Sequence, residues 1–145
     1  MWSAEAVFVC ALGLLGRSVA SFPPVDLIDR PAWGLSKSVQ GYMLPGGRIA
    51  LITSTSAFND ARRGISPCNN VISLREIAGV LIHEEWHVRH GPDEGPAYDA
   101  QLTALAALGA GQDSALYHKV ARAKQAVIAA ARRNARGGRI ARGGE

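Results

Sequence analysis

Three residues, His83, Glu84 and His87, have the types and spacing that could do chemistry in this chain of 145 residues. Helical residues four apart lie on the same face, so His83 and His87 can each aim a ring nitrogen at one metal ion. Glu84 then lies beside that ion and can take a proton from a water molecule whose pKa a zinc ion lowers to about 7. The pattern therefore indicates metal-dependent hydrolysis.

The residues around this motif predict the helix that it needs. Ser73 and Glu76 form a capping box, which marks a helix N-terminus. Apolar residues then recur at helical spacing, and the pair Gly91-Pro92 supplies a stop signal. We therefore expect a helix over residues 74–90 with the motif inside it.

A catalytic zinc ion usually has three protein ligands, and carboxylates follow the Gly91-Pro92 turn. HExxH followed by Glu94-x-x-Ala97-Tyr98 resembles the gluzincin type of metallopeptidase, in which a Glu on the following helix is the third ligand. The resemblance implies a zinc-dependent peptidase that hydrolyses peptide bonds, with Glu84 as general base. It also implies a zinc (Zn2+) site with three ligands: His83, His87 and Glu94.

Other assignments remain open around this motif. In the metzincin type the third ligand lies six residues after the second histidine, a position that Asp93 occupies here. We favour Glu94, because the glycine and the Met-turn of that type are missing. Asp93 or Asp99 could orient a ligating histidine by accepting from its outer nitrogen. Tyr42 and Tyr98 are candidates for donating a hydrogen bond to the oxyanion.

The elements around the motif predict a small α+β domain over residues 21–112. Residues 41–44 and 49–53 read as a hairpin joined by a Pro-Gly-Gly turn, and residues 54–72 read as a loop. An Ala-rich helix is expected over residues 96–108. The resemblance implies a minimal zincin-like fold, with a small sheet packed on the HExxH helix and on the ligand-bearing helix. It also suggests that residues 49–53 align the peptide substrate.

Residues 1–20 read as a signal peptide, because an apolar run is followed by Ser18-Val19-Ala20. Cleavage there would imply export to the periplasm or the medium. A helix packed on the domain would give the same pattern and would fit a cytoplasmic protein. The run is too short to span a membrane. With Cys10 in this segment and Cys68 in the loop, we expect no intramolecular disulfide in the mature chain.

Positive charge is concentrated at the C-terminus, in residues 113–145. From Lys119 onward there are eight Lys or Arg residues against Glu145 alone. Residues 114–134 predict a basic amphipathic helix, and the Gly-Arg tail from Gly137 is expected to be disordered. The segment could contact nucleic acid or an anionic membrane. The alternative function is therefore a non-catalytic, metal-stabilised accessory protein that binds through this helix.

Overall fold

The computed structural model describes residues 1–30 and 39–143. This part of the chain has α+β architecture, which confirms the predicted fold class. The helices are α1 (Ala4–Leu14), α2 (Ser56–Arg62), α3 (Val71–His90), α4 (Glu94–Ala107) and α5 (Ala115–Gly143), with a short 3-10 turn at Val19–Ser21. The strands are β1 (Val25–Ile28), β2 (Gly41–Leu44) and β3 (Arg48–Ile52). Within the described ranges, no helix is both long enough and apolar enough to cross a bilayer.

The three strands form one mixed sheet in the order β1-β3-β2. β2 and β3 are antiparallel, with Gly41 opposite Leu51, which confirms the predicted hairpin. β1 pairs with β3 in parallel, with Val25 opposite Ile49. The apolar run Ile49–Ile52 is buried throughout, as expected for a central strand. β2 is therefore left at an edge of the sheet.

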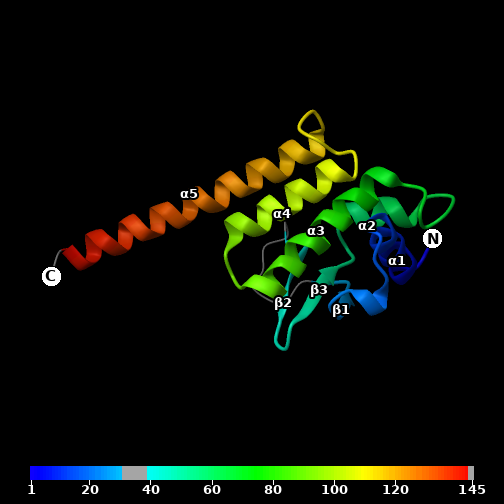
Figure 1. The fold of residues 1–145 in the computed structure, drawn as a ribbon, viewed down its shortest axis with the longest axis horizontal. Helices are drawn as coiled ribbons and strands as arrows, with labels where there is room; N and C mark the ends of the chain where they lie inside the picture. Colours follow the sequence, from blue (N-terminus) through cyan, green and yellow to red (C-terminus); the bar gives the residue numbers. More distant parts are fainter. Residues whose placement is uncertain (31–38, 144–145) are drawn as a thin grey trace.

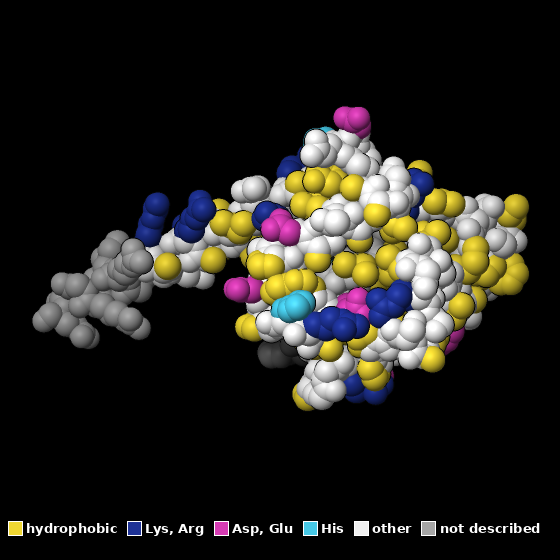
Figure 2. Space-filling view, viewed as in Figure 1, with side chains coloured by type: hydrophobic (Ala, Val, Ile, Leu, Met, Phe, Trp, Pro, Cys, Tyr) yellow, Lys and Arg dark blue, Asp and Glu magenta, His cyan; other side chains and the backbone are white. Residues whose placement is uncertain are grey.

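Helix α3 is the central element of the fold (Figure 1). The sheet, α1 and α2 pack against α3. α4 also packs against α3, and α5 packs against α4. Leu12, Leu51, Phe58 and Leu81 form part of the core and are almost completely buried. Full burial of such a side chain stabilises the fold by about 1.5–3 kcal/mol. α5 then continues well beyond the body of the molecule (Figure 1), and Lys or Arg side chains stand out on the described part of this extension (Figure 2).

Helices α3 and α5 extend beyond their predicted boundaries. Helix α3 begins at Val71, because the side chain of Asn70 accepts a hydrogen bond from the backbone N–H of Ser73 at 3.1 Å. Ser73 therefore lies inside the helix and is buried. At the C-terminus, α5 continues as helix to Gly143, past Gly137, where we expected disorder to begin.

Helix α2 replaces part of the loop that we expected over residues 54–72. Thr55 caps this helix by accepting from the backbone N–H of Phe58 at 3.4 Å. Ala57, Phe58 and Ala61 are buried on one face, so tertiary packing stabilises a helix that its polar composition did not indicate.

The N-terminal segment is part of the core. Val7, Phe8, Ala11 and Leu12 of α1 are buried, so the structure contains the packed helix that was our alternative to a signal peptide. A disulfide joins Cys10 to Cys68, with the Cα atoms 5.2 Å apart. Our expectation of no intramolecular disulfide applied to a chain that has lost the segment carrying Cys10, whereas the full chain has this disulfide.

Candidate metal centre

Helix α3 brings the three motif residues to one buried region. His83, Glu84 and His87 are 7%, 6% and 8% exposed, respectively. Burial of these polar side chains is costly unless each one is hydrogen-bonded, paired or bound to a metal. Their location therefore favours a functional site over a solvated helix face.

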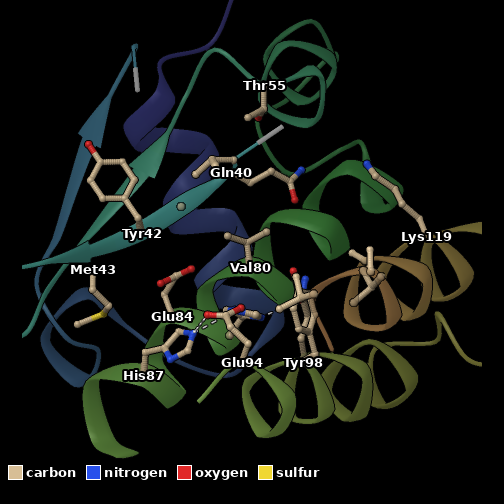
Figure 3. Close-up of a pocket in the computed structure, with 18 of the residues that line it drawn as sticks. Gln40, Tyr42, Met43, Thr55, Val80, Glu84, His87, Glu94, Tyr98 and Lys119 are labelled. Carbon is tan, nitrogen blue, oxygen red and sulfur yellow. Dashed lines mark hydrogen bonds and ion pairs between the residues drawn. The ribbon is translucent and has the colours of Figure 1, made fainter. Parts of the chain in front are cut away.

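The turn after α3 brings the third candidate ligand back to the histidines. Gly91 has a φ of 101°, a conformation that favours glycine, and α4 begins directly afterwards at Glu94. Glu94 Oε1 lies 2.7 Å from His87 Nε2, and Glu94 Oε2 lies 3.3 Å from His83 Nε2. The two Nε2 atoms are 3.2 Å apart. Figure 3 shows His87 and Glu94 facing each other.

These atoms have the arrangement of a metal-ligand set. One ligand atom from each of His83, His87 and Glu94 can be chosen so that all lie within 4.8 Å of one another. Ligand atoms about 2.0–2.1 Å from a tetrahedral zinc ion would lie about 3.3 Å from one another. The Nε2–Nε2 distance of 3.2 Å and the distance of 3.3 Å from His83 Nε2 to Glu94 Oε2 are close to this value. The other carboxylate oxygen, Oε1, lies closer to His87 Nε2, at 2.7 Å. The group could therefore hold a metal ion, and its two imidazoles and one carboxylate suit zinc among other transition metals.

Both histidines are oriented through their outer nitrogens. His83 Nδ1 lies 2.9 Å from the side-chain oxygen of Gln101, and His87 Nδ1 lies 2.8 Å from the carbonyl oxygen of Gly91. Carbonyl oxygens only accept, so each Nδ1 donates and each Nε2 keeps a lone pair directed at the shared point. This is the tautomer that metal ligation requires.

The two aspartates that we considered for that orienting role lie elsewhere. Asp93 is exposed at the N-cap of α4, and Asp99 is exposed and pairs with Lys124 at 2.5 Å. Sequence reasoning missed Gln101, although its signal was present. Gln101 is seven residues after Glu94 and so shares its helix face, whereas Asp99 is five residues after it and does not.

Burial shifts the pKa values of Glu84 and His83 in opposite directions. Burial raises the pKa of Glu84 to about 7, and the charge of Glu94 adds to this rise. Burial lowers the pKa of His83, against the opposing effect of Glu94. The neutral imidazole is therefore favoured, as metal binding needs. Burial, followed by the charges of Glu94 and Glu84, raises the pKa of Tyr98, whose ring centroid is 4.5 Å from that of His83.

The edge strand at the site is β2 and not the run 49–53 that we expected to align substrate. That run forms β3, which is enclosed between β1 and β2. A Cβ atom added to Gly41 would lie 3.2 Å from Val80 Cγ1 and 3.4 Å from Glu84 Cγ. Glycine at this position therefore allows β2 to pack closely on α3 beside Glu84.

The site opens into a cleft of about 1040 Å³. Tyr42 and Tyr98, our two candidate oxyanion donors, both line it, from β2 and α4, respectively. Glu84 points into the same space between β2 and Glu94 (Figure 3). One wall comes from α5, which we had expected to be separate from the catalytic domain.

Comparison of the chain with protein-family models, with curated proteins and with solved structures gives no match. The geometry of the site is therefore the basis for assigning a function.

Proposed function

We propose that this protein is a zinc-dependent peptidase with His83, His87 and Glu94 as metal ligands and Glu84 as general base. One observation carries the proposal. Ligand atoms from two helices lie within 4.8 Å of one another, and the buried carboxylate of Glu84 lines the cleft beside them. Metal ligands beside a carboxylate of raised pKa are the components of metal-assisted hydrolysis.

The chemistry can be divided among the parts of the site. A zinc ion bound there would polarise a carbonyl group and acidify a water molecule. Glu84 would accept the proton of the attacking water on its carboxylate and then deliver it to the leaving amine. A general acid-base group works best when its pKa lies near the working pH, and the value of about 7 for Glu84 meets that condition near neutrality.

A peptide substrate is favoured by the position of β2. This strand pairs with β3 on one side, and its residues Gly41, Tyr42 and Met43 line the cleft. Unpaired backbone groups at a sheet edge can bind an extended chain by strand addition. Because β2 packs on α3 beside Glu84, such a chain would lie next to the ligand set.

We also propose an extracytoplasmic location. The Cys10–Cys68 disulfide is consistent with an oxidising compartment, because disulfides are rare in the cytosol. Thiol labelling of the protein in separated cell fractions would test this. Protein with both thiols labelled in the cytosolic fraction would contradict it. A mature chain that begins at Ser21 would lack Cys10 and exclude the disulfide, but that cleavage would itself indicate export.

The metal proposal is tested by zinc content, measured by mass spectrometry after mild chelation and re-addition of zinc. Wild type should bind one zinc ion per chain, and His83→Ala and Glu94→Ala should lose it. Asp93→Ala is the matched control, because Asp93 is an exposed neighbour of Glu94 and should retain the metal. Zinc lost from Asp93→Ala and kept by Glu94→Ala would move the third ligand to Asp93.

The catalytic proposal is tested by comparing wild type with Glu84→Gln on a mixture of peptides. The variant should keep zinc and lose cleavage, because it keeps the shape of the side chain but cannot accept the proton. Zinc binding without any cleavage by wild type would favour the non-catalytic accessory protein. The exposed arginines of α5 would then be the first surface to test, by salt-dependent binding to nucleic acid and to anionic vesicles.

A further inference from the structure

We infer that the cleft selects its peptide through an apolar side chain next to the scissile bond, which packs on a wall supplied by α5. This inference rests on the proposed peptidase function and adds a substrate class to it. The α5 wall consists of Val120, Ala123, Ala126 and Val127, which line the cleft together with the metal ligands.

The α5 wall is one face of a helix. Its residues are three, six and seven positions after Val120, so they lie on the same side of α5. Val120 is 7% exposed and packs in an apolar cluster with Leu102 and Leu105 of α4, which holds this part of α5 in place. Ala123 and Ala126 carry only a methyl group. Their small size leaves room in the cleft for a side chain of the substrate.

The α5 wall is continuous with the metal ligands. Tyr98 packs against the Val120 cluster, and its ring lies edge-on to His83. Val80 lines the same cleft one helical turn, about 5.4 Å, before Glu84 (Figure 3). An extended peptide advances about 3.3 Å per residue. A side chain within one or two residues of the bond at the metal can therefore reach Val80, which lines the same cleft as the α5 wall.

Charge on this wall does not favour a polar side chain. Among the described residues that α5 contributes to the cleft, only Lys119 is charged, and its Nζ lies 3.0 Å from Glu76 Oε1. Gln40 donates to the other oxygen of Glu76 at 3.1 Å. The ammonium group is therefore already paired. A polar substrate side chain placed against the valines would lose water without gaining a partner.

Binding can be measured separately from catalysis with zinc-loaded Glu84→Gln protein. The probes are two fluorescent peptides that differ only in having Leu or Asn, side chains of similar size, at one position. Each position in turn is compared by fluorescence anisotropy. At one position the Leu peptide should bind about tenfold more tightly, the factor that corresponds to about 1.4 kcal/mol. Equal binding at every position would overturn the inference.

Variants of α5 locate the preference. In the Glu84→Gln background, Ala123→Phe should fill the space and bring the two affinities within about twofold. Gln125→Phe is the matched control, since it adds the same ring on the exposed opposite face and should leave the preference intact. Val127→Thr keeps the shape and adds a hydroxyl, so it should reduce the preference without blocking the cleft. If both wall variants kept the full preference for the Leu peptide, the apolar side chain would bind elsewhere, and the assignment to the α5 wall would be refuted.

Cleavage by wild type separates this inference from the proposed function. Products from a mixed peptide library should show apolar residues enriched at one position beside the cut. Cleavage without such enrichment would overturn the inference and leave the peptidase proposal standing. With no cleavage, the peptidase proposal fails, and the binding comparison still decides whether the α5 wall selects apolar side chains.

Discussion

Replacing Glu84 with Gln should stabilise the metal-free protein in a pH-dependent way. Glu84 is almost fully buried, and its pKa in the folded protein is about 7, against 4.5 for an ordinary Glu side chain. Between these values the folded state holds a proton that the unfolded state releases. The free energy of unfolding therefore falls as the pH rises through this window. A neutral glutamine does not ionise, so the free energy of unfolding of the variant should increase relative to that of wild type as the pH rises.

The size of the effect follows from the two pKa values. One unit of pKa difference is equivalent to about 1.36 kcal/mol, so full ionisation of Glu84 costs the fold about 3 kcal/mol above pH 8. At pH 5 only a small part of this cost is present. The stability difference between Glu84→Gln and wild type should therefore be about 2.5 kcal/mol larger at pH 8 than at pH 5.

The assay is urea unfolding of both proteins with EDTA present, at pH 5 and at pH 8. Comparing the variant with wild type at each pH cancels most contributions from other titrating groups. A difference that does not change with pH would show that Glu84 ionises normally, and would refute both the pKa and the role of burial in tuning the base. Adding zinc should reduce the pH dependence, because a nearby cation stabilises the carboxylate.

The remaining predictions concern the residues that support the site. Cys10→Ser opens a disulfide whose cysteines are 58 residues apart, and should lower stability by about 4 kcal/mol through the entropy of the unfolded chain. Urea unfolding would measure this, with reduced wild type expected to match the variant. Gln101→Leu should weaken zinc affinity about 10–100-fold, since His83 loses its orienting acceptor, and competition with a chelating dye would measure it; unchanged affinity would contradict the role. Arg17→Ala should lower the free energy of unfolding by about 2 kcal/mol, measured by thermal or urea unfolding, because buried Glu85 loses one of its two ion-pair partners among the described residues and keeps only Arg89. Arg89→Ala should cost less, because Arg89 is more exposed than Arg17.

The local features of the site could be predicted because they depend on short-range rules. The i, i+4 spacing of His83 and His87 required only a helix, and the Gly91-Pro92 turn indicated that the next helix would return Glu94 to the same region. The hairpin around β2 and β3 was equally local, because its turn residues lie between two β-rich runs. Each of these predictions used residues within about fifteen positions of one another.

The features that were missed depend on long-range packing. The pairing of Cys10 with Cys68 and that of Arg17 with Glu85 each join positions far apart in the sequence. Nothing local separates an apolar helix that packs in the core from the apolar run of a signal peptide. The contribution of α5 to the cleft was missed for the same reason, because a basic, Ala-rich segment does not show which of its faces is covered.

The packing around the candidate metal ligands depends on two glycines that no motif includes. A Cβ atom on Gly79 would lie 3.1 Å from Leu105 Cδ2 and 3.4 Å from Gln101 Cγ, so glycine there lets α4 pack closely on α3 one turn before His83. Gly41 does the same for β2 beside Glu84. Functional groups must be held to within about 0.5 Å to work. Alanine at Gly79 would displace Gln101 and α4 relative to His83, whereas alanine at Gly41 would displace β2 relative to Glu84. The first change should therefore affect zinc affinity most, and the second should affect turnover by the zinc-loaded protein.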